Sequence, residues 1–75
     1  MKIVFSDHAA AQLKNRPRIK REMVLAAINA PDAATASYRN RTLYRKQFDG
    51  ETLEVVTTTE DDKIIVVTEY FLEQT

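Results

Sequence analysis

The single histidine of the chain, His8, is the side chain best suited to acid-base chemistry. Histidine ordinarily titrates near neutrality, so it can exchange protons in a transphosphorylation of RNA. It follows Ser6 and Asp7, which are typical of a helix start, where free backbone amides and the helix dipole favour anions such as phosphate. Spacing alone favours the alternative, a surface histidine near a helix cap, because no second histidine accompanies it.

Two groups of basic residues are the next candidates, for phosphate binding. Arginine suits bidentate phosphate contacts, and Tyr38 and Tyr44 interleave with the second group as platforms for base stacking. The alternative is a solvated face that pairs with acidic residues or with a neighbouring subunit. The first group is Lys14, Arg16, Arg18, Lys20 and Arg21, and the second is Arg39, Arg41, Arg45 and Lys46.

The charges divide along the chain although the formal net charge is zero. Ten of the eleven Lys and Arg residues lie in positions 1–48, and eight of the eleven Asp and Glu residues lie in positions 49–75. If the fold keeps these parts separate, one face attracts phosphates or an acidic partner.

Composition excludes several other classes of site. The chain has no cysteine, which excludes a disulfide, a thiolate metal site and a Cys nucleophile, and its carboxylates show no calcium-loop pattern. We therefore expect neither a metal nor a cofactor. No apolar run approaches the roughly 18 residues that span a bilayer, and the opening is too short for a signal sequence, so a cytoplasmic protein without a membrane partner is expected.

The pattern of apolar residues and turn formers predicts an α+β fold in one domain over residues 1–75. The predicted order is β-α-α-β-β-β, in which an antiparallel meander packs on two N-terminal helices and an extra strand is an option near Ser37 to Arg39. Pro31 to Ala36 is expected to be a connector. The predicted strands are 2–5, 42–48, 51–58 and 64–71, and the predicted helices are 7–16 and 20–30.

Asp49-Gly50 predicts a two-residue type I′ hairpin, because both positions of this turn require a positive φ. The turn fixes the register and places Arg45 beside Glu54, an exposed pair worth roughly 0 to 1 kcal/mol. One face then carries Tyr44, Phe48, Leu53 and Val55, which is the expected core; the other carries Leu43, Arg45, Gln47, Thr52, Glu54 and Val56. In the first helix, Ala9, Ala10 and Leu13 form the apolar stripe, and His8, Gln12 and Asn15 form the polar one.

In this order the motifs resemble a small bacterial family, domain of unknown function 4258, which is similar to the RelE/ParE-type toxin fold. The resemblance covers nearly the whole chain. Two features depart from the family pattern: Gln12 stands where an arginine is usual, and an extra residue near Pro17-Arg18 replaces a usual glycine. The matching residues are His8-Ala9, Arg16, Glu22 with Val24 and Ile28, Pro31-Asp32, Arg41-x-Leu43-Tyr44-Arg45, Leu53-x-Val55-Val56 and Val66-Val67-Thr68-x-Tyr70.

The resemblance implies a RelE-like fold and a site for RNA, since relatives in that broader superfold cut RNA with basic, His or Tyr side chains around the scissile phosphate. By this resemblance His8 is the acid or base, while Arg16, Arg41 and Arg45 hold phosphate and stabilise developing charge. The candidate catalytic residues are His8, Arg41, Arg45 and Tyr70, and the candidate nucleic-acid-binding residues are Lys14, Arg16, Arg18, Arg21, Arg39, Tyr44 and Lys46.

We therefore expect a toxin-like RNA-binding domain that acts as a metal-independent endoribonuclease, with RNA or the ribosome and an antitoxin-type protein as partners. The alternative is a non-catalytic interaction module, such as a homodimer, because so small a core cannot cover every apolar side chain of the meander. A third option is nucleic-acid binding without cleavage. The apolar side chains in question are Leu43, Val56, Ile65, Val67 and Phe71.

Overall fold

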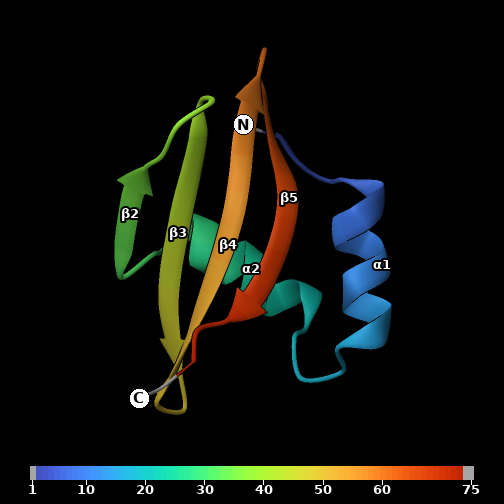
Figure 1. The fold of residues 1–75 in the computed structure, drawn as a ribbon, viewed down its shortest axis with the longest axis vertical. Helices are drawn as coiled ribbons and strands as arrows, with labels where there is room; N and C mark the ends of the chain where they lie inside the picture. Colours follow the sequence, from blue (N-terminus) through green and yellow to red (C-terminus); the bar gives the residue numbers. More distant parts are fainter. Residues whose placement is uncertain (1, 74–75) are drawn as a thin grey trace.

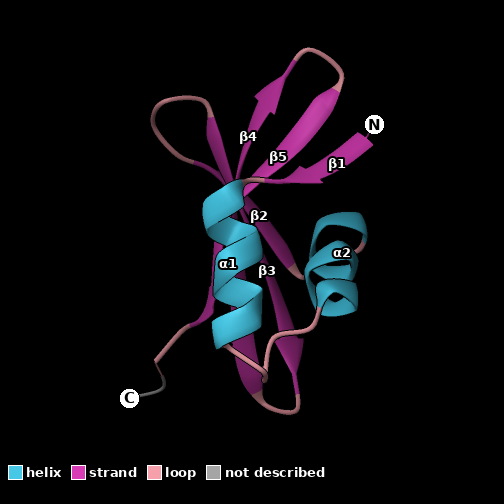
Figure 2. Cartoon of the chain, turned by 90° about the vertical axis from the view of Figure 1, so that its right-hand side faces the viewer, coloured by secondary structure: helices cyan, strands magenta, loops and turns pink. Residues whose placement is uncertain are grey.

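A five-stranded mixed sheet with one helix packed on its back face and a second helix along its side forms the fold (Figures 1 and 2). The computed structural model describes residues 2–73. The elements in chain order are β1 (Lys2–Phe5), α1 (Asp7–Asn15), α2 (Arg21–Asn29), β2 (Ala33–Ala36), β3 (Arg41–Phe48), β4 (Glu51–Glu60) and β5 (Lys63–Phe71).

The strand order across the sheet is β1-β5-β4-β3-β2. β1 pairs with β5 in parallel, and the other neighbours are antiparallel, so the predicted meander is confirmed and the sheet as a whole is mixed. The α+β class is therefore confirmed, whereas the predicted element order lacked a strand.

That strand is β2, which lies inside the segment expected to be a connector. The optional strand near Ser37 to Arg39 was placed too late, because the chain turns there and Arg39 and Asn40 have φ values of 64° and 59°. Four small residues, Ala-Ala-Thr-Ala, carry no alternation of apolar and polar side chains. Pairing with β3 makes them a strand, and the sequence alone does not signal it.

The hairpin between β3 and β4 has the predicted turn and register. Asp49 and Gly50 have φ values of 53° and 83°, and Phe48 lies opposite Glu51. The pairing of Arg45 with Glu54 is confirmed in the same register.

The first helix begins as its sequence predicts. Ser6 is the N-cap, and its Oγ accepts a hydrogen bond from the backbone N–H of Ala9 at 3.1 Å. Both helices end one residue earlier than expected: α1 stops at Asn15, before Pro17, and α2 stops at Asn29, before Pro31.

The core lies between the helices and the sheet face that carries Leu53 and Val55, both fully buried, which confirms the predicted inner face. Tyr44 and Phe48 pack against this core from the same face, whereas Ala10, predicted to join the apolar stripe of α1, is exposed. The core cluster is Ala9, Ile19, Val24, Ala27, Ile28, Leu53, Val55, Ile64 and Val66.

The opposite face of the sheet, which we call the open face, is turned toward the viewer in Figure 1, with α2 behind it. Helix α2 packs on β3 and β4, and α1 packs along β5 and β1, so neither helix lies on the open face. The register assigns Arg41, Leu43, Arg45, Glu54, Val56, Thr68 and Tyr70 to it.

Candidate functional site

A row of three polar side chains crosses the open face on neighbouring strands. The register sets Arg45 of β3 opposite Glu54 of β4, and Glu54 opposite Tyr70 of β5. Arg45 Nε donates to Glu54 Oε1 at 2.8 Å, and the Tyr70 hydroxyl donates to Glu54 Oε2. The carboxylate is therefore held at both oxygens, by a cation on one side and a phenol on the other.

Burial distinguishes this row from an ordinary surface ion pair. The side chain of Glu54 is 6% exposed, while that of Arg45 is 44% exposed. The expectation of an exposed pair is therefore wrong for the carboxylate, because β3 and β5 flank it and remove it from water. A desolvated carboxylate needs its donors, so loss of either partner leaves an unsatisfied buried group.

Tyr70 is a hydrogen-bond donor in this row and not a base. The pKa of its hydroxyl is raised to about 12, first by burial and then by the hydrogen bond to Glu54 and the charge of that carboxylate, while the charge of Arg45 acts in the opposite direction. The phenol thus keeps its proton at neutral pH and fixes the orientation of the carboxylate. Glu54 is left as the one anionic group of the row.

This arrangement has the parts of a proton-transfer site for phosphoryl chemistry. A fixed carboxylate can accept a proton from a hydroxyl that reaches it, and a half-exposed guanidinium can stabilise charge that develops on phosphate. Sequence reasoning included Arg45 and Tyr70 and missed Glu54 as a candidate. The predicted register already set Glu54 opposite Arg45, but only the third strand showed that it is buried between two donors.

Arg41 lies further along the open face, at the start of β3, and Arg39 lies in the turn before that strand. Arg41 precedes Arg45 by four residues on the same face, roughly 13 Å along the strand. Both arginines line a hollow of about 330 Å³ with Tyr38, which is 86% exposed. This end of the open face therefore combines cations with an accessible aromatic ring.

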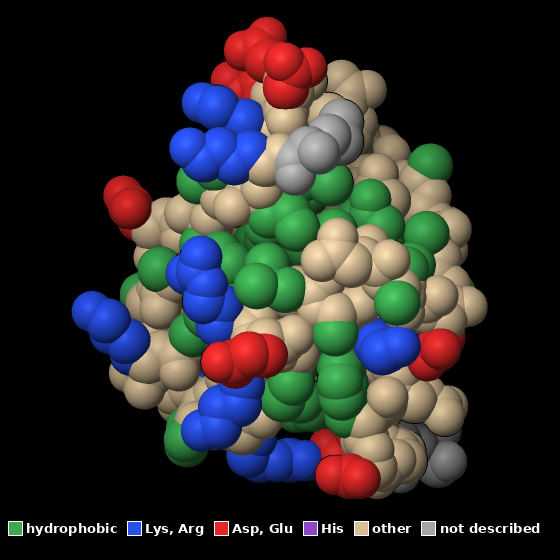
Figure 3. All heavy atoms as spheres, turned by 180° about the vertical axis from the view of Figure 1, so that it is seen from behind, with side chains coloured by type: hydrophobic (Ala, Val, Ile, Leu, Met, Phe, Trp, Pro, Cys, Tyr) green, Lys and Arg blue, Asp and Glu red, His purple; other side chains and the backbone are tan. Residues whose placement is uncertain are grey.

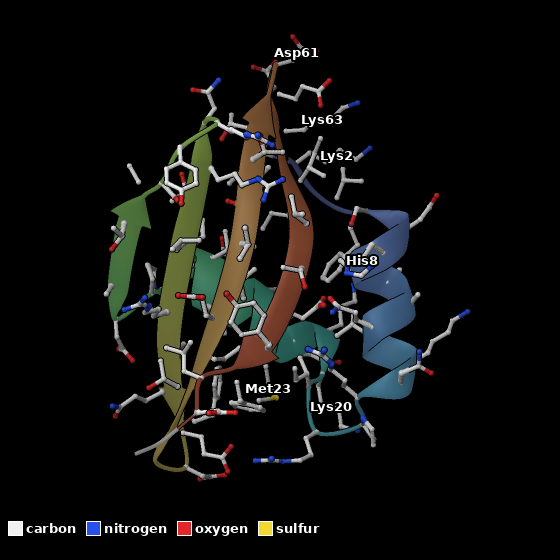
Figure 4. The ribbon with its side chains drawn as sticks, viewed as in Figure 1. Lys2, His8, Lys20, Met23, Asp61 and Lys63 are labelled. Atoms are coloured by element: carbon white, nitrogen blue, oxygen red, sulfur yellow. The ribbon has the colours of Figure 1, made fainter. Side chains whose placement is uncertain are left out.

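His8 is exposed, as predicted, and lies in the first turn of α1, on the side of the helix that faces β5 (Figure 4). Gln12, one turn later on the same stripe, accepts from the Thr68 hydroxyl at the edge of β5. β5 and β4 therefore stand between His8 and Arg45. The structure brings Arg45 and Tyr70 together through Glu54 and leaves His8 beside the row.

Most cations of the helix connection are engaged within the fold. Arg16 Nη1 donates to the carbonyl oxygen of Glu69 at 2.9 Å. Arg18 pairs with Glu51, which raises its pKa, and its guanidinium lies over the Phe71 ring. Arg21 lies 4.8 Å from the centroid of the Phe5 ring.

Two predicted contact residues of β3 lie on the core side of the sheet. Tyr44 is partly buried against the core, and Lys46 Nζ donates to the carbonyl oxygen of Ala30 at 2.8 Å. Within residues 2–73 the ion pairs are Arg18 with Glu51 and Arg45 with Glu54. Lys14, Arg39 and Arg41 thus keep cationic groups outside any ion pair in this part of the chain.

The face seen from behind does not gather these charges into one patch. Figure 3 shows Lys and Arg side chains spread along it, with acidic side chains between them and apolar surface at its centre, and no histidine is visible there. On this face, basic and acidic side chains are therefore intermixed, and the expected separation of the two kinds of charge is only partial.

Glu69, the neighbour of Tyr70 in β5, points to the opposite face and into the core. It is fully buried, and within the described residues neither of its carboxylate oxygens has a hydrogen-bond partner. Burial raises the pKa of Glu69 to about 7, while the backbone amide and the charge of Arg16 act in the opposite direction. The interface between α1 and β5 thus contains a carboxyl group that titrates near neutrality.

Among residues 2–73, no three or more His, Cys, Asp or Glu side chains are grouped so that they could hold a metal ion. No helix in that part of the chain has the length and apolar character needed to cross a membrane.

The family model for domain of unknown function 4258 (DUF4258) matches residues 5–71, which include α1, α2 and the Arg45, Glu54 and Tyr70 row. No curated protein and no solved structure matches the chain.

Proposed function

Because the chain belongs to the DUF4258 family, whose description names no activity, we propose its function from the site: a RelE-like, toxin-like RNA-binding domain that cleaves RNA without a metal ion on the open face. The observation that carries this proposal is the buried carboxylate of Glu54, held between Arg45 and Tyr70 on a sheet face that neither α1 nor α2 covers. The resemblance to RelE-type proteins supports the same class of substrate.

The proposed reaction is attack of a ribose 2′-hydroxyl on the adjacent phosphate. Glu54 accepts the 2′-hydroxyl proton as the O2′–P bond forms, and the bond from phosphorus to the 5′ oxygen breaks. The leaving 5′ oxygen takes a proton from water, and the hydroxide that remains takes the proton back from Glu54, so the products are a 2′,3′-cyclic phosphate and a 5′-hydroxyl. Arg45 stabilises the charge on the non-bridging oxygens, and Tyr70 holds the carboxylate in place.

The RNA strand is proposed to continue from this row toward Arg41 and Arg39, where the exposed ring of Tyr38 offers a stacking surface. His8 and Lys14 on α1 would contact the strand where it leaves the open face beside β5. Because phosphate contacts release counterions, the affinity for RNA should fall steeply with ionic strength. A flat salt response would contradict phosphate binding.

The test is cleavage of varied RNAs, and of messenger RNA on translating ribosomes, in the presence of EDTA. We expect Glu54→Gln to lower the rate by roughly 100- to 10,000-fold, because the amide cannot accept the proton. Glu60→Gln, at the exposed end of β4, is the matched control and should keep the rate. His8→Ala measures the separate contribution of the histidine.

Two outcomes would contradict the catalytic proposal. One is a wild-type protein that is inert on all these substrates although it is folded. The other is a Glu54→Gln variant that cleaves as fast as wild type. If the protein binds RNA at low salt, loses it at high salt and never cleaves it, the proposed function is reduced to RNA binding.

A protein-interaction module, with an antitoxin-type protein or a second copy as partner, is the second candidate function. It is favoured by Tyr38, the one large apolar side chain that is strongly exposed among residues 2–73. The other apolar side chains expected outside the core are half-buried or, for Val56, buried. A folded protein that is inert on RNA and binds a protein partner through the surface around Tyr38 would support this candidate over the first.

A further inference from the structure

The outer edge of β2 is open. β2 is the last strand of the sheet on the side of β3, all four of its residues are exposed, and none is charged or a proline (Figure 1). An edge strand presents unpaired N–H and C=O groups, and proteins commonly protect such edges with charges, prolines, bulges or covering segments. β2 has none of these four devices.

The chain does protect another edge. Beyond the part that pairs with β1, β5 is covered by polar side chains of α1 and its cap. Ser6 Oγ donates to the carbonyl oxygen of Val67 at 3.3 Å, and Arg16 donates to that of Glu69. The Gln12 side-chain oxygen accepts from the N–H of Glu69 at 3.4 Å. Within residues 2–73 no side chain makes a corresponding hydrogen bond to β2.

The hydrogen bonds to β3 determine which groups of β2 point outward. The N–H of Ser37 donates to the carbonyl oxygen of Arg41 at 2.7 Å, so Ser37 faces β3. The direction of the backbone groups alternates along an antiparallel strand, so Thr35 also faces β3. Ala34 and Ala36 therefore present their N–H and C=O groups to the outside.

We propose that two copies of the chain pair through β2, antiparallel and around a two-fold axis at Thr35. In this register Ala34 lies opposite Ala36 of the second copy, and each such pair exchanges both of its hydrogen bonds. Among symmetric registers, this one allows both outward residues of β2, Ala34 and Ala36, to form hydrogen bonds with β2 of the second copy. Thr35 then lies opposite itself in a pair without backbone hydrogen bonds, and Thr–Thr is a favourable cross-strand pair.

The residues at the two ends of β2 are complementary in this arrangement. Asp32 precedes the strand and Arg39 follows it, so antiparallel pairing brings the acid of each copy toward the base of the other. The exposed Tyr38 arrives opposite Asp32 of the second copy.

A strand of four residues gives a small interface, so the dimer should be in concentration-dependent exchange with the monomer. The two-fold axis is perpendicular to the sheet, so the open faces of both copies lie on the same side of the dimer. Pairing through β2 is a matter of assembly alone and does not depend on whether the protein cleaves RNA.

Cysteine cross-linking tests the register directly, because the natural chain contains no cysteine. In the proposed dimer the two Thr35 Cα atoms lie about 4.5 Å apart, within the range of a disulfide. Thr35→Cys should form a covalent dimer on mild oxidation, at least tenfold more than Ala33→Cys. Ala33 is on the same face of the same strand, but it lies opposite Ser37 of the second copy.

Sedimentation at increasing protein concentration measures the dimer itself. Ala36→Pro removes an outward N–H and keeps those directed to β3, so it should lower dimer formation at least tenfold while circular dichroism confirms the fold. Asp32→Lys and Arg39→Glu should each weaken the dimer, and their combination should restore it. The proposal is overturned by a wild-type chain that stays monomeric at every concentration, or by equal cross-linking of Thr35→Cys and Ala33→Cys.

Discussion

The guanidinium of Arg16 donates a hydrogen bond to the backbone carbonyl oxygen of Glu69, 53 positions later in the chain. Sequence reasoning assigned this arginine to phosphate, and in the structure it closes the free edge of β5 from the end of α1. The Gln12 side-chain oxygen accepts a hydrogen bond from the N–H of the same residue. The polar stripe of α1 is therefore part of what joins helix and sheet.

Arg16→Ala should destabilise the fold by about 1 to 3 kcal/mol, because it leaves the carbonyl group of Glu69 without its donor. Urea unfolding at neutral pH measures the change. Lys14→Ala, on the exposed side of the same helix, is the control and should change stability by less than about 0.5 kcal/mol. Equal effects of the two substitutions would show that the hydrogen bond contributes nothing.

Stability should depend on pH through Glu69. Its folded pKa of about 7 lies above the ordinary value of 4.5, so the folded state holds the proton between these values while the unfolded state releases it. The free energy of unfolding should therefore fall as pH rises from about 4.5 to 7 and stay reduced above that, by up to about 3 kcal/mol.

Glu69→Gln should remove this pH dependence, because the amide mimics the protonated acid. The variant should be more stable than wild type at pH 8 and close to it at pH 4.5, measured by urea unfolding at both values. Glu73→Gln, at an exposed position after β5, is the control. The assignment would be refuted if the free energy of unfolding of the wild type rises from pH 5 to 7 and if Glu69→Gln shows the same rise.

The hydroxyl of Tyr70 should titrate well above the ordinary tyrosine value of 10. Its pKa of about 12 comes from burial first and then from Glu54, so Glu54→Gln should lower it toward the ordinary value of 10. Ultraviolet titration of wild type, Glu54→Gln and Tyr70→Phe identifies the signal, since Tyr70→Phe removes it. Identical titration curves for wild type and Glu54→Gln would contradict the hydrogen bond between these residues.

Gly50→Ala should destabilise the hairpin by about 1 kcal/mol through the backbone alone. Gly50 has a φ of 83°, which is unfavourable for a residue with a Cβ, although no atom lies within 4 Å of the position a Cβ would take. Thermal unfolding of the variant measures the change. An unaffected midpoint would show that the turn relaxes to another type at no cost.

The local elements could be predicted from the sequence because short-range chemistry determines them. Ser6 and Pro17 bracket the first helix, and Asp49-Gly50 fixes both the turn and the register that joins Arg45 to Glu54. In a strand that register also decides the inner face, because side chains alternate and one face must be apolar. These signals lie within a few residues of the structures they determine.

β2 and the candidate site depended on contacts between distant segments. Ala33 to Ala36 have no pattern of their own and become a strand only because β3 offers a pairing edge. The sequence predicts Glu54 only as the partner of Arg45 in an exposed pair. The hydrogen bond from Tyr70 to its other carboxylate oxygen depends on the pairing of β5 with β4.

The sequence by itself determined the α+β class, the hairpin register, the exposure of His8 and the division of charge along the chain. Only the tertiary structure decided how those charges are used: Arg16 and Arg18 hold the fold together, Glu54 is withdrawn from water, and Glu69 is buried without a partner among the described residues. The physical reason is that the free energy of a charged group depends on its solvation and its neighbours in space, which come from strands and helices far apart in the chain.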